Sequence, residues 1–367
     1  MNFSTIIRKK NSLLLPFSLL YKLGVYIYHS LYHFGLKKAY SPPIPTICIG
    51  NLSVGGTGKS PMVEYLLRLI QALQDNPTGA LSPKEYHPAV LSRGYRRKTR
   101  GYVLAEEGVT AADIGDEHMQ FYQKFPAVTI AVAEKRVEGI RLLIEQKPKT
   151  DVIILDDAFQ HRAVKAGLNI LLTDYNHLYY KDGYLPAGSL RDLKSSANRA
   201  DMIVVTKTDR NISETERQRI IKAIRPLAHQ RVFFTAISYG TAYPVFNKEA
   251  VWPVKLDAIV LVTGIANPAP VLEYLKQYQA TITHFNYPDH YSFSSKDIED
   301  ILNNCGNTEN RIILTTEKDA VRLMEWGQLA EVPVFALPIR HDFLFNEGKE
   351  FDQRIANYIN KTPSSSL

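Results

Sequence analysis

The sequence predicts an α/β protein of two domains, in which the larger domain is a parallel sheet covered by helices on both faces. Length is the first observation, because 367 residues exceed what a single core usually organises. The second is the alternation of short Val-, Ile- and Leu-rich runs with amphipathic segments, which is typical of parallel sheets. The third is that this alternation restarts near residue 240. We therefore predict an amphipathic helix within 1–40, a three-layer domain at 41–240 and a smaller α/β domain at 241–367.

The individual elements follow from these patterns. In the first domain, strands are expected at 45–50, 87–92, 127–133, 151–156, 168–174, 201–207 and 231–238, and helices at 62–74, 116–125, 135–146 and 213–224. In the second domain, strands are expected at 257–264, 280–286, 311–317 and 332–338, and helices at 268–278, 294–304 and 318–327.

The N-terminal segment is apolar, rich in tyrosine and flanked by basic residues. At about 100° per residue, one side of this helix is polar and carries Lys22, Tyr26, His29 and His33. The opposite side is apolar and carries Leu20, Leu23, Ile27, Leu31 and Phe34. Such a helix can lie in a membrane interface. The alternative is a helix that docks its apolar side on the protein's own core.

The run "CIGNLSVGGTGKSP", residues 48–61, predicts a phosphate-binding loop between a strand and a helix. Its glycines allow the backbone to turn and to present N–H groups to phosphate oxygens. We expect Lys59 to reach the β- and γ-phosphates and Ser60 to contact Mg²⁺. The predicted nucleotide-binding residues are Asn51, Ser53, Val54, Gly55, Gly56, Thr57, Gly58, Lys59 and Ser60. Ser53 stands in place of the first glycine and Pro61 follows the Lys-Ser pair, yet ordinary backbone angles and the first helical turn accommodate both. The alternative is a glycine-rich turn without a ligand.

Two further stretches bear on a nucleotide site. The apolar strand "DVIILDD" ends in Asp156 and Asp157, where a carboxylate would help to orient Mg²⁺, although Asp also serves in turns and caps. "TKTD", Thr206 to Asp209, is similar to a guanine-reading motif in which Thr replaces Asn. For this stretch we favour a strand that continues into a polar turn.

Charge and cysteine content narrow the function only slightly. A formal net charge of +7 suits an anionic partner such as a nucleotide, nucleic acid or an acidic membrane surface, or simply a solvated surface. The two cysteines, Cys48 and Cys305, are too far apart in sequence for a metal-binding spacing or a disulfide framework.

The order and spacing of "LSRGYRRKTRG", "IGDEHMQF", "AEKR", "DDAFQHR", "YLPAGSLRD", "NYPDHYSF" and "TTEKDAVRL", together with the phosphate loop, resemble the lipid A 4′-kinase (tetraacyldisaccharide 4′-kinase) family. The resemblance implies transfer of the γ-phosphate of ATP, with Mg²⁺, to the 4′ hydroxyl of a tetraacyldisaccharide 1-phosphate. It also implies a glycolipid substrate, no nucleic-acid partner, and a peripheral location on the cytoplasmic face of the inner membrane, reached through the N-terminal helix. It implies no particular protein partner.

The resemblance also assigns roles to individual residues. Asp116 matches the family's proposed base and His290 the histidine thought to pair with it, in addition to Lys59 in the phosphate loop. Because these two residues fall in different predicted domains, domain closure would assemble the site. Without the resemblance, Asp116 could equally cap the helix that follows it.

The remaining matched positions concern the acceptor and the metal. The positions associated with substrate binding are Tyr95, Glu117, Arg136 and Arg191. Asp192 departs from the pattern, because the family usually has Glu there, and we keep it as a weaker magnesium ligand beside Asp156 and Asp157. The competing function is a GTPase-like switch or metallochaperone associated with the membrane. It would require an intact guanine motif or Cys/His metal spacing, and the sequence has neither.

Overall fold

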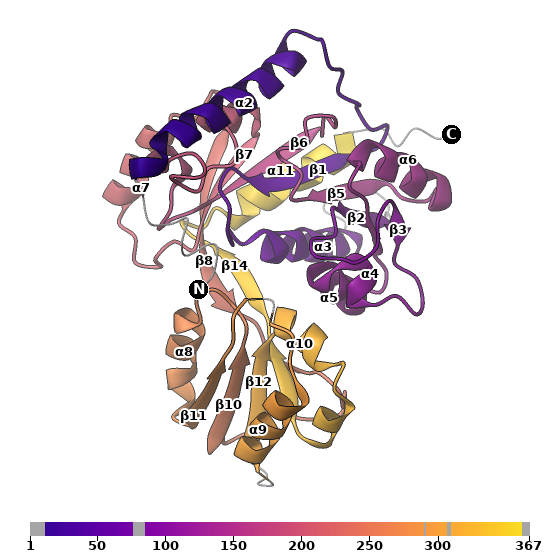
Figure 1. The fold of residues 1–367 in the computed structure, drawn as a ribbon, viewed down its shortest axis with the longest axis vertical. Coiled ribbons are helices and arrows are strands. Elements are labelled where there is room, and N and C mark those ends of the chain that lie inside the picture. The colour runs from indigo at the N-terminus through magenta and orange to yellow at the C-terminus, as the bar shows by residue number, and fades with distance from the viewer. Residues whose placement is uncertain (1–11, 76–84, 290, 307–309, 362–367) are drawn as a thin grey trace. The chain divides into compact units, whose positions relative to one another are not determined.

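The computed structural model of the chain describes residues 12–75, 85–289, 291–306 and 310–361. These residues form two compact units (Figure 1). One holds the described residues up to 237 together with those from 341 onward, and the other holds 238–340. The sequence had placed 341–367 in the second domain. The described part of that segment instead returns to the first unit, because helix α11 (Gly348–Lys361) buries Phe351, Ile355 and Ile359 in the first unit's core.

The first unit is built on a mostly parallel sheet. Among the described residues its strand order is β14-β8-β7-β6-β1-β5-β2-β4-β3. The bounds are β1 (Thr46–Asn51), β2 (Pro88–Ser92), β3 (Val103–Leu104), β4 (Thr129–Val132), β5 (Val152–Asp156), β6 (Leu168–Asp174), β7 (Met202–Thr206), β8 (Arg231–Tyr239) and β14 (Ile339–Phe343). The strand before the phosphate loop, β1, pairs in parallel with both β5 and β6. The acidic end of β5 and the end of β6 therefore flank the loop.

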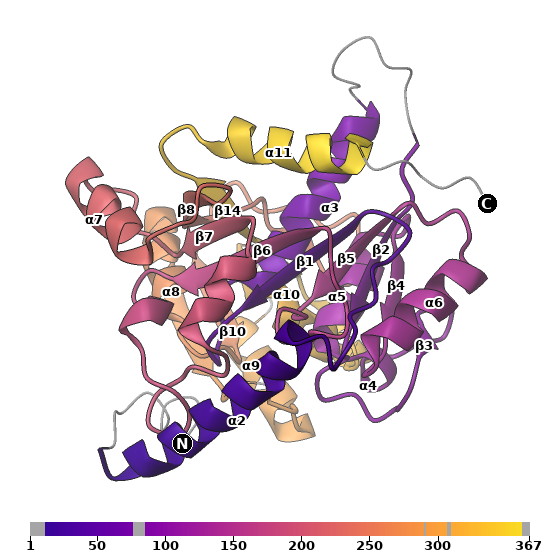
Figure 2. The ribbon, with the colours of Figure 1, turned by 90° about the horizontal axis from the view of Figure 1, so that it is seen from above.

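Helices cover both faces of this sheet, which confirms the predicted three layers (Figure 2). The core on one face includes side chains of α3 (Lys59–Asp75), α4 (Ala111–Ile114), α5 (Asp116–Lys124) and α11. The core on the other face includes side chains of α6 (Arg136–Gln146), η2 (Tyr179–Lys181), η3 (Lys194–Arg199) and α7 (Glu214–Ile224). Strands such as β1 are buried along their whole length, because both faces are covered.

The second unit is a smaller α/β structure, also as predicted. In the described residues its sheet has the order β11-β10-β12-β13-β9, in which only the β13–β9 pair is antiparallel. Its strands are β9 (Tyr243–Pro244), β10 (Ala258–Thr263), β11 (Thr281–Asn286), β12 (Arg311–Thr316) and β13 (Val334–Leu337). Its helices are α8 (Ala269–Leu275), η4 (Lys276–Tyr278), α9 (Ser295–Cys305), α10 (Glu317–Leu323) and η5 (Gly327–Glu331).

Helix α2 (Leu15–His33), which follows η1 (Ser12–Leu14), lies along the outside of the first unit (Figures 1 and 2). It docks through polar groups. The Ser18 hydroxyl accepts from the backbone N–H of Ala187 at 2.9 Å, and the Tyr21 hydroxyl donates to the carbonyl of Arg191 at 3.0 Å.

The apolar side of α2 is left exposed. Leu20, Leu23 and Ile27 keep 66%, 53% and 52% of their surface, and Ser18 is the buried residue of the helix. The alternative in which the apolar side docks on the protein's own core is therefore wrong. Within the described ranges, the structure contains no helix with both the length and the apolar character needed to cross a membrane.

Candidate active site

The phosphate loop has the predicted strand–loop–helix context. Strand β1 ends at Asn51, and α3 begins at Lys59 and Ser60, directly after Gly58. Gly55 and Gly58 have φ values of +113° and +83°, a region that side-chain-bearing residues rarely adopt. A Cβ on Gly58 would also lie 3.0 Å from the ring of His341. The glycines at these two positions are therefore required by the shape of the loop.

Side chains from neighbouring strands hold consecutive carbonyls of this loop. The Lys207 ammonium group donates to the carbonyl of Gly56 at 2.5 Å, and the Thr206 hydroxyl donates to the carbonyl of Thr57 at 2.9 Å. The Nε2–H of His341 donates to the carbonyl of Gly58 at 2.8 Å. Because these carbonyls already have donors, the loop is fixed before any ligand arrives. The Thr57 hydroxyl is buried and without a partner among the described residues, and is left for a ligand.

His341 is neutral at physiological pH, and the hydrogen bonds of its ring identify the tautomer. The Thr235 hydroxyl donates to Nδ1 at 2.9 Å, which places the ring proton on Nε2, the atom that donates to Gly58. Desolvation of its ring lowers the pKa of this partly buried histidine to about 4, against the opposing effect of the Gly58 hydrogen bond. His341 was not predicted from the sequence, because nothing in the local pattern around β14 indicates that this strand lies against the loop.

Lys207 and Thr206 belong to the stretch that is similar to a guanine-reading motif. Lys207 adopts a left-handed backbone conformation, with φ of +55°, and its ammonium group also pairs with Asp174 at 2.9 Å. This segment is therefore more than a polar turn after a strand. Since the Thr206 hydroxyl is committed to the loop carbonyl, the segment supports the loop.

The two carboxylates after β5 have different surroundings. Both terminal nitrogens of Arg191 donate to the Asp157 carboxylate, and Nη1 lies 3.1 Å from Oδ2. The Lys59 ammonium nitrogen lies 3.7 Å from Oδ1 of the same carboxylate. Burial alone would raise the pKa of Asp157, but the charges of Lys59 and Arg191 hold it well below its usual range. Asp157 is thus ionised and already paired. Arg191, predicted to bind substrate, also donates to the side chain of Asn51 in the loop.

Asp156 is more deeply buried and less satisfied. It is 2% exposed, and its Oδ1 has no hydrogen-bond partner among the described residues. Nε2 of the buried His118 lies 3.5 Å from Oδ2. A buried carboxylate oxygen without a partner is costly unless something else binds it. The donor set of Asp156 and the Ser60 hydroxyl fits the oxygen ligands that Mg²⁺ prefers.

No group of three or more His, Cys, Asp or Glu side chains within the described ranges could hold a metal by itself. In kinases, Mg²⁺ is usually bound through one or two carboxylates together with phosphate oxygens of the substrate.

Asp116 is the first residue of α5, and Gly115 before it occupies the N-cap position with φ of +88°. The capping alternative for Asp116 is therefore not realised. A Cβ on Gly115 would lie 2.8 Å from the carbonyl oxygen of Tyr95, so this close approach brings Tyr95 next to Asp116 and Glu117. Tyr95 itself is 66% exposed. The backbone at Tyr95 and the start of α5 therefore lie close together.

Arg136 and Asp192 occupy unexpected positions. Arg136 is buried and donates to the carbonyl of Ala133, and burial lowers its pKa to about 10 although Asp156 and Asp157 oppose this effect. Asp192 is also buried. Its oxygens accept from the residues that dock α2 and order η3, namely His29, Leu193, Ser196, Arg199 and Gln160. This arrangement supports a structural role for Asp192 and gives no support to a magnesium ligand. His290 lies outside the described residues.

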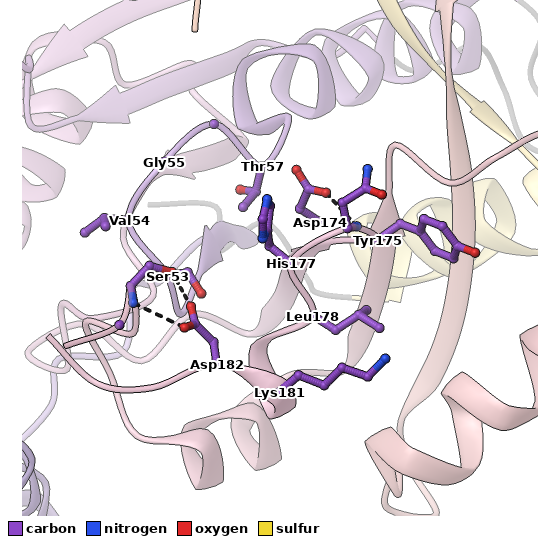
Figure 3. A pocket seen from close by; sticks show the side chains of 14 residues that line it. Ser53, Val54, Gly55, Thr57, Asp174, Tyr175, His177, Leu178, Lys181 and Asp182 are labelled. Atoms are coloured by element: carbon purple, nitrogen blue, oxygen red, sulfur yellow. Dashed lines mark hydrogen bonds between the residues drawn. The ribbon is translucent and has the colours of Figure 1, made fainter. Parts of the chain in front are cut away.

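A cavity of about 240 Å³ opens beside the phosphate loop (Figure 3). Loop residues Ser53 to Thr57 line one side, and the segment after β6, from Asp174 to Asp182, lines the other. The backbone N–H of Val54 donates to the carbonyl of Ser189, which anchors the outer part of the loop. The cavity lies at the carboxyl ends of β1 and β6, where open parallel sheets bind ligands.

Comparison with known proteins identifies close relatives. The model of the family described as tetraacyldisaccharide-1-P 4′-kinase matches residues 10–360. A tetraacyldisaccharide 4′-kinase from Bacteroides thetaiotaomicron is 44% identical over 96% of this chain and 94% of its own length. One from Flavobacterium johnsoniae is 43% identical over 95% of this chain and 96% of its own length.

A solved structure is also similar. It is described as the "apo" form of LpxK from Aquifex aeolicus in complex with ATP. It superimposes with a TM-score of 0.71 at 28% sequence identity, and covers 95% of this chain and 99% of its own. The match includes the sequence of both units and confirms the phosphate-loop kinase fold.

Proposed function

The chain belongs to the tetraacyldisaccharide-1-P 4′-kinase family, and we propose that its phosphate loop, Asp116 and the acidic end of β5 perform that family's reaction. It is an ATP-dependent kinase of lipid A biosynthesis that uses Mg²⁺ and phosphorylates the 4′ hydroxyl of a glycolipid precursor. The observation that carries the site assignment is the pre-organised loop, whose carbonyls at Gly56, Thr57 and Gly58 are held by Lys207, Thr206 and His341.

In this proposal the loop N–H groups and Lys59 bind the phosphates of ATP. Lys59 leaves Asp157 to do so, and Arg191 keeps that carboxylate paired. Ser60 and Asp156 hold the metal, since Asp156 has the unpartnered oxygen. When bound, Mg²⁺ neutralises charge that develops on the phosphate oxygens.

The acceptor's 4′ oxygen attacks the γ-phosphorus, the bond from that phosphorus to the β–γ bridging oxygen breaks, and ADP leaves. Asp116 accepts the proton of the hydroxyl as the new bond forms, with His290 as its proposed partner. Tyr95 and Glu117, which lie next to Asp116, are proposed to contact the sugar head group. The buried Arg136 is proposed to contribute positive charge behind the site.

Purified protein mixed with labelled Mg-ATP and disaccharide 1-phosphate in detergent micelles tests the reaction. We expect label in a lipid product that carries a new phosphate at the 4′ position. Nucleotide binding without any transfer to the lipid would overturn the kinase function.

The alternative GTPase-like switch or metallochaperone is not favoured. The residue that should read guanine is Thr206, and its hydroxyl is bound to the loop. Both cysteines are buried, so neither is available as a surface metal ligand.

We further propose that the exposed apolar side of α2 lies in the cytoplasmic face of the inner membrane, where the acceptor's acyl chains are held. The support is that α2 docks by its polar groups and leaves Leu20, Leu23 and Ile27 in solvent, where large apolar side chains are unfavourable without a partner. Flotation with lipid vesicles tests this. The double variant Leu20→Glu/Leu23→Glu should stay unbound, whereas unchanged binding would remove the anchoring role.

A further inference from the structure

A second cavity, of about 400 Å³, lies between α2 and the segment that contains η3. It shares no lining residue with the cavity beside the phosphate loop. Its lining combines basic groups with aromatic ones, chiefly His29, His33, Arg162, Arg199, Tyr26 and Phe34. The catalytic proposal leaves this cavity without a role.

Arg162 brings an unneutralised positive charge to the cavity. Its Nη1 lies 2.7 Å from Nδ1 of His29, and a guanidinium group can only donate, so this His29 nitrogen accepts. The ring proton of His29 therefore sits on Nε2, which donates to Asp192 at 2.6 Å. Within the described ranges no carboxylate pairs with Arg162, whose other contact is the ring of Tyr32, 5.2 Å away.

Arg199 adds a second guanidinium group. One of its nitrogens pairs with Asp192 at 3.1 Å, and another donates to the carbonyl of Phe159. Its Nε is buried and has no acceptor among the described residues. Arg199 thus pairs with a carboxylate that Leu193 and Ser196 also bind, and Arg162 reaches that carboxylate only through His29. The excess positive charge suits an anion with several oxygens, such as a phosphate group.

The cavity also borders the exposed apolar side of α2. Phe34, which belongs to that apolar side, lines it and is 74% exposed, and Tyr26 from the polar side lines it as well and is 59% exposed. A ligand that carries both a phosphate and acyl chains would satisfy both surfaces at once. The basic groups would bind the phosphate and the helix would contact the chains.

We propose that this cavity binds the phosphate of an anionic membrane phospholipid whose acyl chains lie along the apolar side of α2. The inference rests on the proposed membrane association of α2 and specifies its lipid. Bound lipid would fix how α2 lies in the leaflet, and with it the orientation of the first unit above the acceptor.

Vesicle flotation of the full chain tests this inference. Wild-type protein is compared on vesicles of phosphatidylcholine alone and of phosphatidylcholine with phosphatidylglycerol. The variants are Arg162→Gln, the charge-retaining Arg162→Lys, and Lys349→Gln as a control that removes one positive charge from α11, on the opposite face of the sheet. Binding to neutral vesicles measures the anchoring by α2. The ratio of the affinity for anionic vesicles to that for neutral vesicles measures the contribution of the cavity.

We expect wild-type protein, Arg162→Lys and Lys349→Gln to prefer the anionic vesicles, and Arg162→Gln to lose about fivefold in that preference while its binding to neutral vesicles is unchanged. An equal loss in Arg162→Gln and Lys349→Gln would show a diffuse charge effect and overturn the proposal. So would an Arg162→Gln variant that keeps its preference for anionic vesicles but shows a raised KM for the acceptor in neutral micelles, because the cavity would then belong to the acceptor. Failure of wild-type protein to bind neutral vesicles would count against the anchoring role of α2, whereas the loss of anionic preference in Arg162→Gln alone would still support the cavity.

Discussion

The phosphate loop and helix α2 differ in which of their groups have partners within the protein. In the loop, the carbonyls of Gly56, Thr57 and Gly58 all accept hydrogen bonds from side chains of surrounding segments, which hold the backbone in place. In α2, the polar side is bound to the first unit and the large apolar side chains are left in solvent.

The difference indicates where each substrate's binding energy comes from. A nucleotide meets a site whose geometry is already fixed, so little ordering cost is incurred on binding. A lipid meets a surface that gains favourable energy only when apolar area is covered. Mutations in the phosphate loop should therefore change nucleotide affinity without changing lipid binding, and mutations in α2 should do the reverse.

The largest expected effect is at Asp116, which belongs to neither region. Replacing Asp116 with Asn removes the proton acceptor and keeps its size, so kcat should fall by about 10² to 10⁴. Nucleotide affinity should change little, because the loop is untouched. Steady-state kinetics and nucleotide titration measure the two effects. The control Glu107→Gln removes an exposed carboxylate from a turn and should leave both unchanged. Equal losses of turnover and nucleotide affinity in Asp116→Asn would mark the residue as structural.

A smaller effect is expected from weakening the loop's support. Lys207→Met removes a charged hydrogen bond to Gly56, and nucleotide affinity should fall about tenfold. Lys207→Arg should recover part of this loss, and Lys222→Met, on the exposed side of α7, should have no effect. Calorimetric titration with ATP gives the affinities. A variant with lowered Tm but unaltered affinity would separate Lys207 from the nucleotide site.

The smallest effect concerns pH. His341 has an ordinary pKa of 6.5 when unfolded and about 4 in the folded protein, because the fold removes much of the water around its ring. Between these values the unfolded chain binds the proton and the folded chain does not, so stability is full above about pH 6.5 and falls as pH is lowered toward 4. Urea unfolding over this range should show a shallower pH dependence in His341→Gln than in the wild type. Identical slopes in the two proteins would contradict the buried neutral state.

Most of the fold could be predicted from sequence. The buried strands are continuous apolar runs, and the strand before the phosphate loop is bounded by a Pro and by the glycine-rich turn. Helix α11 was missed although the spacing of Phe351, Ile355 and Ile359 is helical, and that omission misplaced the end of the chain. Strand β14 was missed as well, because it is short and only partly buried.

The parts of the site that are contiguous sequence motifs could be predicted. The parts that depend on contacts between residues far apart in the chain could not. The phosphate loop and the acidic end of β5 are contiguous motifs. The support that His341 gives to Gly58 joins residues far apart in the chain, and no periodicity encodes it. The same limit applies to Asp192, whose role in docking α2 appears only once His29 is seen beside it.

The most direct test of the account compares one acceptor in two settings. Phosphoryl transfer is measured with the disaccharide lipid in detergent micelles and in vesicles, for wild-type protein and for Leu20→Glu/Leu23→Glu. We predict transfer by both proteins in micelles at similar rates, and a much lower rate for the variant on vesicles alone. Equal loss in both settings would contradict the separation of the nucleotide site from the lipid-facing helix, and absence of transfer by the wild type would contradict the kinase function itself.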